Sequence, residues 1–204
     1  MSQYKTYKEF HTASIDNRDA FWSEQARMIH WHKPFEKVSD FSRPPFAKWF
    51  VGGLTNLCYN AIDRHLATRG DQKALIYIST ETDEEKTYTY KDMHAEVNRF
   101  AAVLQAQGVG KCDRVLLYMP MIVEGVFAML ACARIGAIHS VVFGGFAAAS
   151  CATRIDDAKP KVMITSDAGM RAGKPIIYKP LVDEAIRLAQ FPPEKVIIVN
   201  RGID

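Results

Sequence analysis

Two glycine-containing stretches carry residue types that could bind a nucleotide. The first consists of Phe143, Gly144 and Gly145, and it follows an apolar run that predicts a β-strand. Two adjacent glycines remove both Cβ atoms, so a flat ring of a ligand could rest on the bare backbone. The same pair could equally serve only as a tight turn between a strand and the helix predicted after it.

The second stretch consists of Arg171, Ala172, Gly173 and Lys174. Two cations in a glycine-containing loop suit a phosphate group. The stretch is not a P-loop, because only three residues separate Gly169 from Gly173 and Pro175 stands where a Ser or Thr should hold magnesium. Taken alone, these residues are more typical of an exposed loop with solvated charges.

Considered together, the two stretches are more informative. Each follows a predicted strand, and the carboxyl ends of parallel strands meet at one edge of a sheet, where ligands of open α/β sheets bind. One stretch offers backbone for stacking a ring, and the other offers cations for pairing with phosphate. The ligand that explains both is a phosphorylated nucleotide.

Two other groupings give weaker signals. His30 and His32 have the spacing of metal ligands, but the sequence shows no third ligand, so we do not expect a metal site. Asp156 and Asp157 resemble a catalytic carboxylate pair, yet they end a predicted helix, and we expect a structural role. The chain contains neither a G-x-S-x-G nor a G-x-G-x-x-G motif.

Strands and helices alternate from about residue 55 onward. Strands are predicted at residues 74–79, 87–90, 114–118, 137–142, 162–165 and 196–199, with a solvated loop at 81–85. Helices are predicted at 55–69, 91–107, 120–135, 147–157 and 179–190, with Pro120 in a first helical position. This alternation predicts an α/β fold, with a doubly wound, mostly parallel sheet and flanking helices.

The first fifty residues have a different character, because they contain all three tryptophans and many other aromatic residues. One helix is predicted at 19–29, followed by irregular chain. We expect this region to wrap a larger body through its aromatic side chains instead of forming its own core.

Bulk properties limit the functional class. The chain has 204 residues, 48% hydrophobic and 24% charged, which is ordinary for a soluble domain. The net charge of +3 is scattered, so we expect no nucleic-acid partner. No apolar run reaches about 18 residues, so we expect no membrane partner. Four cysteines without a C-x-x-C pair indicate reduced thiols and a cytoplasmic location.

Several long runs resemble a known family. Residues 114–121 and 131–146 resemble the acetyl-CoA and propionyl-CoA synthetases of the adenylate-forming superfamily, and 49–65 is similar to their N-terminal region. Residues 44–50 and 154–160 look more like the propionyl type. The resemblance divides the chain into an acetyl-CoA-synthetase-type N-terminal region, 1–64, and the first part of a truncated AMP-binding domain, 65–204.

The resemblance also implies a two-step reaction. A carboxylate attacks the α-phosphorus of ATP, giving an acyl-adenylate and pyrophosphate, and the CoA thiol then displaces AMP. The loop matching Arg171, Ala172, Gly173 and Lys174 contacts the nucleotide end of CoA in related enzymes, and the backbone matching Phe143, Gly144 and Gly145 packs near its adenine. Lys174 stands where acetyl enzymes usually carry arginine, so planar two-pronged pairing is lost there.

The family's catalytic residues and magnesium ligands have no counterpart in this sequence. The resemblance therefore implies that ATP, CoA and Mg²⁺ are used by a longer polypeptide, that its remainder completes the site, and that these 204 residues alone are inactive. Three alternatives stay open: an acetyl-CoA synthetase in place of a propionyl-CoA synthetase, a non-catalytic module that binds the CoA nucleotide, and a scaffold without a ligand.

Overall fold

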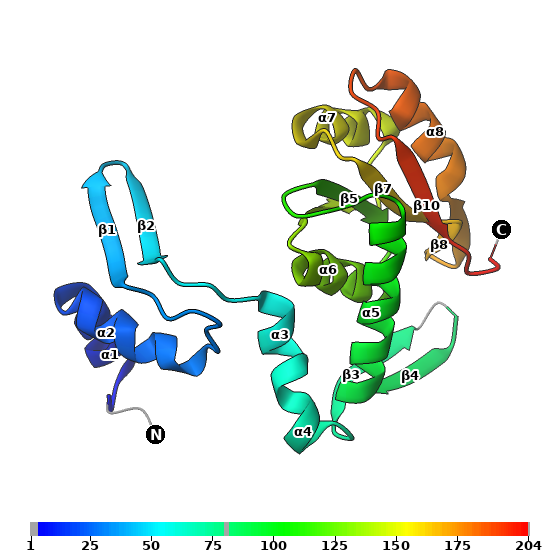
Figure 1. Ribbon diagram of the computed structural model, residues 1–204. Helices are drawn as coiled ribbons and strands as arrows, with labels where there is room; N and C mark the ends of the chain where they lie inside the picture. Colours follow the sequence, from blue (N-terminus) through cyan, green and yellow to red (C-terminus); the bar gives the residue numbers. More distant parts are fainter. Residues whose placement is uncertain (1–3, 80–81, 204) are drawn as a thin grey trace. The chain divides into compact units, whose positions relative to one another are not determined.

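The computed structural model describes residues 4–79 and 82–203, and the chain forms two compact units, 1–56 and 57–204 (Figure 1). The first unit contains α1 (Tyr7–Asp16), α2 (Arg18–Gln25), η1 (Ala26–Met28), β1 (Lys37–Arg43) and β2 (Phe46–Val51). The two strands form an antiparallel hairpin. The predicted helix is present as α2 and η1, but the prediction of irregular chain after it was wrong.

Aromatic rings hold the first unit together. Phe21 is 2% exposed, and its ring centroid lies 4.8 Å from that of Phe10. The Trp22 and Trp49 rings lie 5.9 Å apart, and the Trp31 indole N–H donates to the Ala26 carbonyl at 2.9 Å. The unit thus has a small aromatic core of its own, contrary to the sequence-based expectation. Whether its exposed rings also contact a larger body stays a prediction.

The second unit opens with short helices and a hairpin. Its first elements are α3 (Leu57–Ala61), η2 (Asp63–His65), α4 (Leu66–Arg69), β3 (Lys73–Ser79), β4 (Glu84–Thr89) and α5 (Tyr90–Ala106). The helix predicted at 55–69 is therefore broken, since Ile62 leaves helical geometry at φ −124°. The loop predicted at 81–85 is shorter, because Glu84 and Glu85 belong to β4; residue 81 lies outside the described residues.

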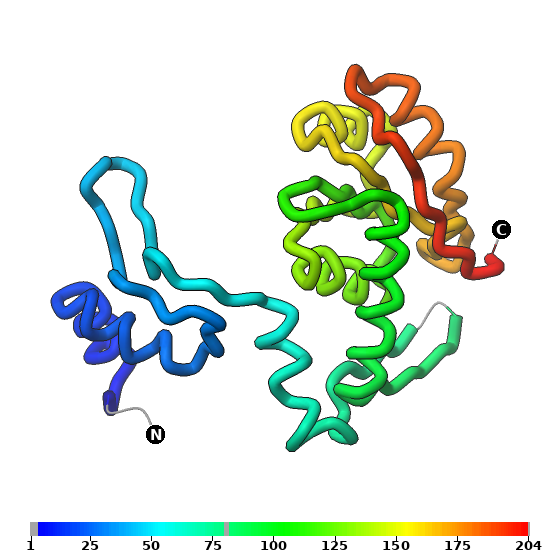
Figure 2. The backbone as a smooth tube through the Cα atoms, viewed as in Figure 1, coloured from blue at the N-terminus to red at the C-terminus, as the bar shows by residue number. Residues whose placement is uncertain are grey.

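A four-stranded parallel sheet forms the body of this unit. Its strands are β5 (Arg114–Met119), β6 (Ile138–Phe143), β7 (Val162–Ser166) and β10 (Lys195–Val199), in the order β10-β7-β5-β6. The connecting helices are α6 (Val123–Ile135), α7 (Ala148–Ala158) and α8 (Tyr178–Leu188). Helices α5 and α6 pack together on one face and α7 and α8 on the other (Figure 2). The predicted α/β fold with flanking helices is confirmed.

Predominantly apolar strands produce this doubly covered sheet. Every residue of β7, and all of β5 after Arg114, is buried, as expected for strands with helices on both faces. Successive side chains point to opposite faces. Accordingly, Leu117 and Ile164 enter the core under α5 and α6, whereas Leu116 and Met163 enter the core under α7 and α8.

Two local predictions were wrong near the carboxyl edge of the sheet. Pro120 does not begin a helix, because α6 starts at Val123 with Ile122 in extended geometry at its N-cap. The stretch predicted as a loop after β7 contains a small antiparallel hairpin of β8 (Ala168–Arg171) and β9 (Lys174–Ile177). This hairpin stands beside the end of the sheet and carries the second candidate stretch.

Candidate functional site

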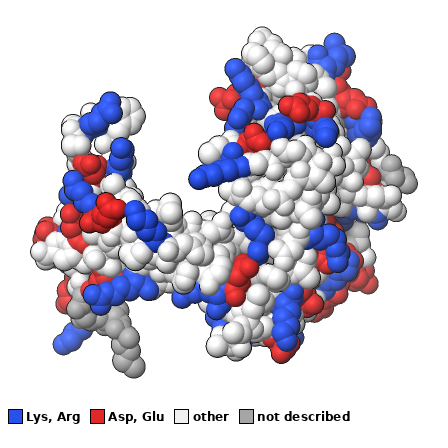
Figure 3. Space-filling model, in the orientation of Figure 1, with Lys and Arg blue, Asp and Glu red and all other residues white. Residues whose placement is uncertain are grey.

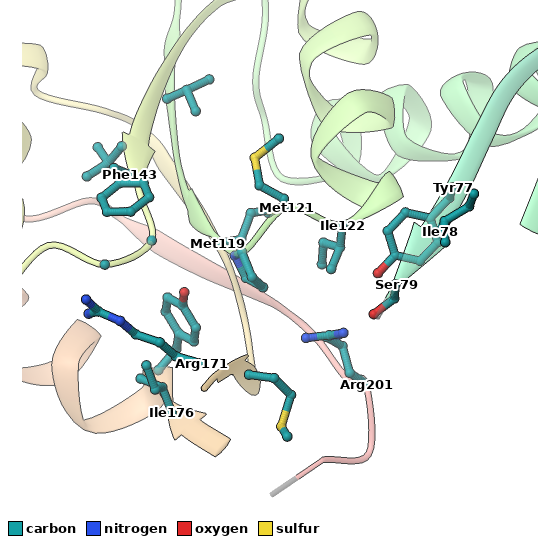
Figure 4. A pocket seen from close by; sticks show the side chains of 17 residues that line it. Tyr77, Ile78, Ser79, Met119, Met121, Ile122, Phe143, Arg171, Ile176 and Arg201 are labelled. Atoms are coloured by element: carbon teal, nitrogen blue, oxygen red, sulfur yellow. The ribbon is translucent and has the colours of Figure 1, made fainter. Parts of the chain in front are cut away.

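A cavity of about 690 Å³ opens at the carboxyl edge of the parallel sheet (Figure 4). Its walls come from the ends of β3, β5 and β6, from the β8–β9 hairpin and from the start of α8. The chain leaves β5 for β6 on one side, and β7 lies on the other side of β5. The cavity therefore lies at the point where the strand order reverses, which is the usual ligand site of such sheets.

The first candidate stretch lines this cavity. Phe143, Gly144 and Gly145 all border it, and Phe143 is 69% exposed. A Cβ atom built on Gly144 would lie 2.4 Å from the Tyr178 hydroxyl oxygen and 2.8 Å from the Met119 carbonyl oxygen. Close packing around residue 144 thus requires a glycine, which agrees with a role for Gly144 in the tight turn after β6. Because glycine has no side chain, the backbone is left bare at the cavity wall.

Tyr178 joins the two candidate stretches. It is 3% exposed, and a Cβ atom built on Gly169 would lie 3.0 Å from its Cε2, so β8 packs on the same ring as Gly144. Its ring centroid lies 5.2 Å from that of Tyr118, whose hydroxyl donates to the Phe146 carbonyl. Burial raises the pKa of Tyr118 to about 12, so this hydroxyl keeps its proton.

The second candidate stretch forms the tip of the β8–β9 hairpin. Arg171 borders the cavity and pairs with Lys174 in the ladder, so the two cations lie on the same face of the hairpin. Among the described residues, no carboxylate oxygen lies within 4.0 Å of a charged nitrogen of either side chain. Two like charges held side by side without a counter-charge repel each other, an arrangement that a bound anion would relieve.

The structure thus gathers four of the seven predicted residues around one cavity. Phe143, Gly144, Gly145 and Arg171 line it, whereas Ala172, Gly173 and Lys174 lie in the adjoining turn and strand. For all seven residues, contact with a ligand stays a prediction.

The turn between Arg171 and Lys174 holds strain that a substitution can test. Ala172 and Gly173 have φ values of 50° and 73°, the pattern of a type I′ hairpin turn. Alanine is unfavourable there, whereas asparagine tolerates it. We expect Ala172→Asn to raise the free energy of unfolding by about 0.5–1 kcal/mol. Urea unfolding measures the change, with Ala172→Val as the opposite control; an equal or lower stability of the asparagine variant would contradict the turn assignment.

Sequence reasoning missed Asp167 and Arg201. The Asp167 carboxylate accepts hydrogen bonds from the backbone amides of Ala168 at 2.7 Å, Arg201 at 2.7 Å and Gly202 at 2.8 Å. Burial raises the pKa of Asp167, but these hydrogen bonds outweigh burial and hold the pKa below its usual value. Arg201 borders the cavity. Its position two residues after a predicted strand was the signal that could have revealed it.

One of the weaker sequence signals has a structural explanation. The Asp156 carboxylate accepts hydrogen bonds from the Gln190 and Phe191 amides at 2.7 and 2.9 Å, the structural role that was predicted. Among residues 4–79 and 82–203, no three His, Cys, Asp or Glu side chains cluster as metal ligands would. Within the same residues, no helix is long and apolar enough to span a membrane.

The four cysteines are all free, and three of them are buried. Burial raises the pKa of Cys132 to about 12 and that of Cys151 to about 11, so these thiols stay protonated and unreactive near neutral pH. On the face of the second unit seen in Figure 3, basic and acidic side chains are interspersed.

Comparison with known proteins identifies relatives over nearly the whole chain. Residues 62–201 match the family of AMP-binding enzymes, and residues 7–61 match the acetyl-coenzyme A synthetase N-terminus. The chain is 55% identical to a propionate–CoA ligase of Salmonella typhimurium, covering 97% of this chain and 32% of that protein. It is 51% identical to an acetyl-coenzyme A synthetase of Methylobacterium radiotolerans, covering 96% of this chain and 31% of that protein.

A solved structure shows the same fold. Acetoacetyl-CoA synthetase from Streptomyces lividans superposes with a TM-score of 0.88 at 30% identity, over 100% of this chain and 31% of that one. The chain thus spans about a third of the length of the relatives it matches. The two family matches meet between residues 61 and 62, and the sequence identities and the shared fold agree with them. The chain belongs to the family of AMP-binding enzymes, joined to an N-terminal segment of the acetyl-coenzyme A synthetase type.

Proposed function

We propose that this chain is the N-terminal part of an AMP-forming short-chain acid–CoA ligase that acts on propionate. In the proposed reaction, a propionate oxygen attacks the α-phosphorus of ATP and pyrophosphate leaves. The CoA sulfur then attacks the acyl carbon, loses its proton and displaces AMP. The 55% identity to a propionate–CoA ligase over nearly the whole chain is the observation that carries the proposal.

Acetate is the second candidate substrate, because the identity to an acetyl-coenzyme A synthetase is nearly as high at 51%. The test is an assay of the full-length protein with ATP, CoA and either acid, with AMP and pyrophosphate measured as products. A larger kcat/KM for propionate supports the proposal. A larger kcat/KM for acetate would replace the substrate, and the absence of AMP with both acids would refute the reaction class.

Within this reaction, we assign the cavity of this chain to the nucleotide end of CoA. The Phe143 ring and the backbone of Gly144 and Gly145 form an apolar wall for the adenine ring. Arg171 and Lys174 supply charge for the 3′-phosphate, and the turn of Ala172 and Gly173 fixes their spacing. We assign no residue of this chain to acyl transfer or to Mg²⁺, which would accompany ATP on the remainder of the polypeptide.

Arg171 provides the direct test of this assignment. We expect Arg171→Gln in the full-length ligase to raise KM for CoA about tenfold or more, with little change in KM for ATP, because a hydrogen bond to a charged phosphate is lost. The increase should vanish with dephospho-CoA, which lacks the 3′-phosphate. Steady-state kinetics with both thiols measure it, and an unchanged KM for CoA would exclude Arg171 from the site.

The non-catalytic alternative has its own experiment. The proposal expects no pyrophosphate from the isolated 204 residues with ATP and propionate, and only weak heat with CoA in calorimetry. Pyrophosphate release would show that the chain is a complete catalyst. Tight CoA binding without turnover would instead favour a binding module, and its absence in a folded chain would favour a scaffold.

A further inference from the structure

The cavity carries a second arginine that the proposed CoA assignment does not use. Arg201 follows β10 and borders the cavity together with Arg171. In Figure 4 the two arginines lie on different sides, Arg171 on the side of Phe143 and Arg201 on the side of Ser79. A ligand that fills the cavity would therefore meet two separate positive charges.

Arg201 is held in place at both its backbone and its side chain. Its amide donates to the Asp167 carboxylate at 2.7 Å, and its Nη1 donates to the Ala168 carbonyl at 3.0 Å. A side chain fixed in this way loses less conformational freedom when it binds a ligand. The rest of the guanidinium is available to contact a ligand, because Nη1 alone is used by the described residues.

The charge of Arg201 is not neutralised by its neighbours. No carboxylate of the described residues lies within 4.0 Å of its guanidinium. The Asp167 carboxylate is near enough in the fold to be considered as a counter-charge for this guanidinium. Its oxygens instead accept hydrogen bonds from the backbone amides of residues 168, 201 and 202. By contrast, Arg99, Arg134 and Arg187 of the same unit all form ion pairs.

The wall around these two cations favours an anionic ligand with a flat apolar part. Met119, Ile122 and Ile176 are among the lining residues. Apolar walls lower the local dielectric constant, which strengthens the attraction between a fixed guanidinium and an anion. Arginine also matches the geometry of phosphoryl oxygens, to which it can donate two hydrogen bonds at once.

We propose that Arg201 is a second phosphate-binding residue of the cavity, contacting a phosphoryl group other than the one assigned to Arg171, and that Asp167 is the positioning residue that holds it. The inference rests on the proposed function, since it takes the ligand to be a nucleotide substrate of the ligase. Two substrates could supply this phosphoryl group: the diphosphate of CoA and the phosphates of ATP.

The experiment compares Arg201→Gln with wild type in the full-length ligase, using CoA, dephospho-CoA and ATP as varied substrates. We expect about a tenfold rise in one KM with a smaller change in kcat, the loss that follows removal of one hydrogen bond to a charged group. A rise that is equal for CoA and dephospho-CoA assigns Arg201 to the CoA diphosphate, and a rise for ATP assigns it to ATP.

A matched control removes the same charge elsewhere. Arg187 lies on α8, is exposed and pairs with Glu184 at 2.7 Å. Arg187→Gln should leave every KM within about twofold, because surface pairs contribute little. If Arg201→Gln lowers only the melting temperature and leaves all KM values unchanged, Arg201 is structural and the proposal is overturned.

Further variants keep the proposal testable. If Arg201→Gln fails to fold, Arg201→Lys takes its place in the experiment. Lysine lacks the planar fork with which arginine can donate to Ala168 and to a phosphate at once, so we expect about a threefold rise in KM. An unchanged KM would overturn the proposal. Asp167→Asn should raise the same KM, with little further rise in the double variant, because the two residues act as one unit. Additive effects of the two substitutions would reject the positioning role of Asp167.

The outcomes also separate this inference from the proposed function. An Arg171→Gln variant with unchanged KM for CoA refutes the CoA assignment of that residue, whatever Arg201 does. Even if Arg171 is excluded in this way, a rise in KM for ATP alone in Arg201→Gln supports a contact between Arg201 and a phosphoryl group.

Discussion

Gly144→Ala is expected to abolish binding at the cavity and to lower the free energy of unfolding by about 3 kcal/mol, as overpacking does where neighbours cannot move. The new methyl group would lie 2.4 Å from the Tyr178 hydroxyl and 2.8 Å from the carbonyl oxygen of Met119. The second contact is with backbone of β5, a central strand paired on both sides. The strand end or the Phe143 wall must therefore shift.

The neighbouring glycine gives a matched control. A Cβ atom on Gly145 would lie 2.6 Å from the ring of Phe143, but that side chain is 69% exposed and can rotate away. Gly145→Ala should therefore cost less than about 1 kcal/mol. Urea unfolding measures the stability of both variants, and steady-state kinetics of the full-length ligase measure their KM for CoA. Equal effects at the two positions would show that close packing at Gly144 is not what requires glycine.

A second-site change sharpens this prediction. Tyr178→Phe removes the hydroxyl that the alanine methyl group would meet, while the contact with Met119 remains. The double variant should recover part of the stability lost in Gly144→Ala. If the double variant loses as much free energy of unfolding as the two single variants together, Tyr178 does not cause the clash.

Asp167→Ala is expected to lower the free energy of unfolding by about 3 kcal/mol, since several backbone amides lose a charged acceptor at once. Asp167 is 7% exposed, and it ties the end of β7 to the chain that follows β10. Asp183, an exposed residue of α8 paired with Lys179, is the control. Its replacement by alanine should change stability by less than about 1 kcal/mol.

The contribution of Asp167 also depends on pH with a defined sign. Its pKa in the folded protein lies below the ordinary value of 3.8. The stabilisation is therefore fully present above pH 3.8 and is lost as the pH falls through the lower, folded pKa. The stability difference between wild type and Asp167→Asn should be largest near neutral pH and should shrink below pH 3.8. A difference that is constant from pH 7 to pH 3 would contradict this.

Much of the second unit could be predicted from sequence because its signals are local. The apolar runs of β5 and β7, and the helices between the strands, follow directly from periodicity. Phe143 and Arg171 were singled out because each follows such a run, Phe143 directly and Arg171 six residues later. The β8–β9 hairpin was missed because its strands have four residues each and its turn is Ala-Gly, without the Asn or Asp that usually marks a type I′ turn.

The remaining site residues depend on contacts between distant parts of the chain. Asp167 meets the amide of Arg201 across 34 positions of sequence, and Tyr178 reaches the Gly144 backbone from the start of another helix. No periodicity in the sequence encodes such meetings. In the first unit, the hairpin of β1 and β2 was missed because its buried and exposed positions do not alternate cleanly.

The position of β10 in the sequence affects the order in which the parts of the cavity assemble during synthesis. Among the strands that the structure describes, β10 comes last in the sequence, and it pairs with β7 at one edge of the four-stranded sheet. A nascent chain that has emerged as far as α8 already holds Phe143, Gly144 and Arg171, yet Asp167 still lacks the amides of residues 201 and 202. The contacts that hold Arg201 at the cavity therefore form only after β10 has been made, and a chain cut before β10 would expose the β7 edge to pairing with other molecules.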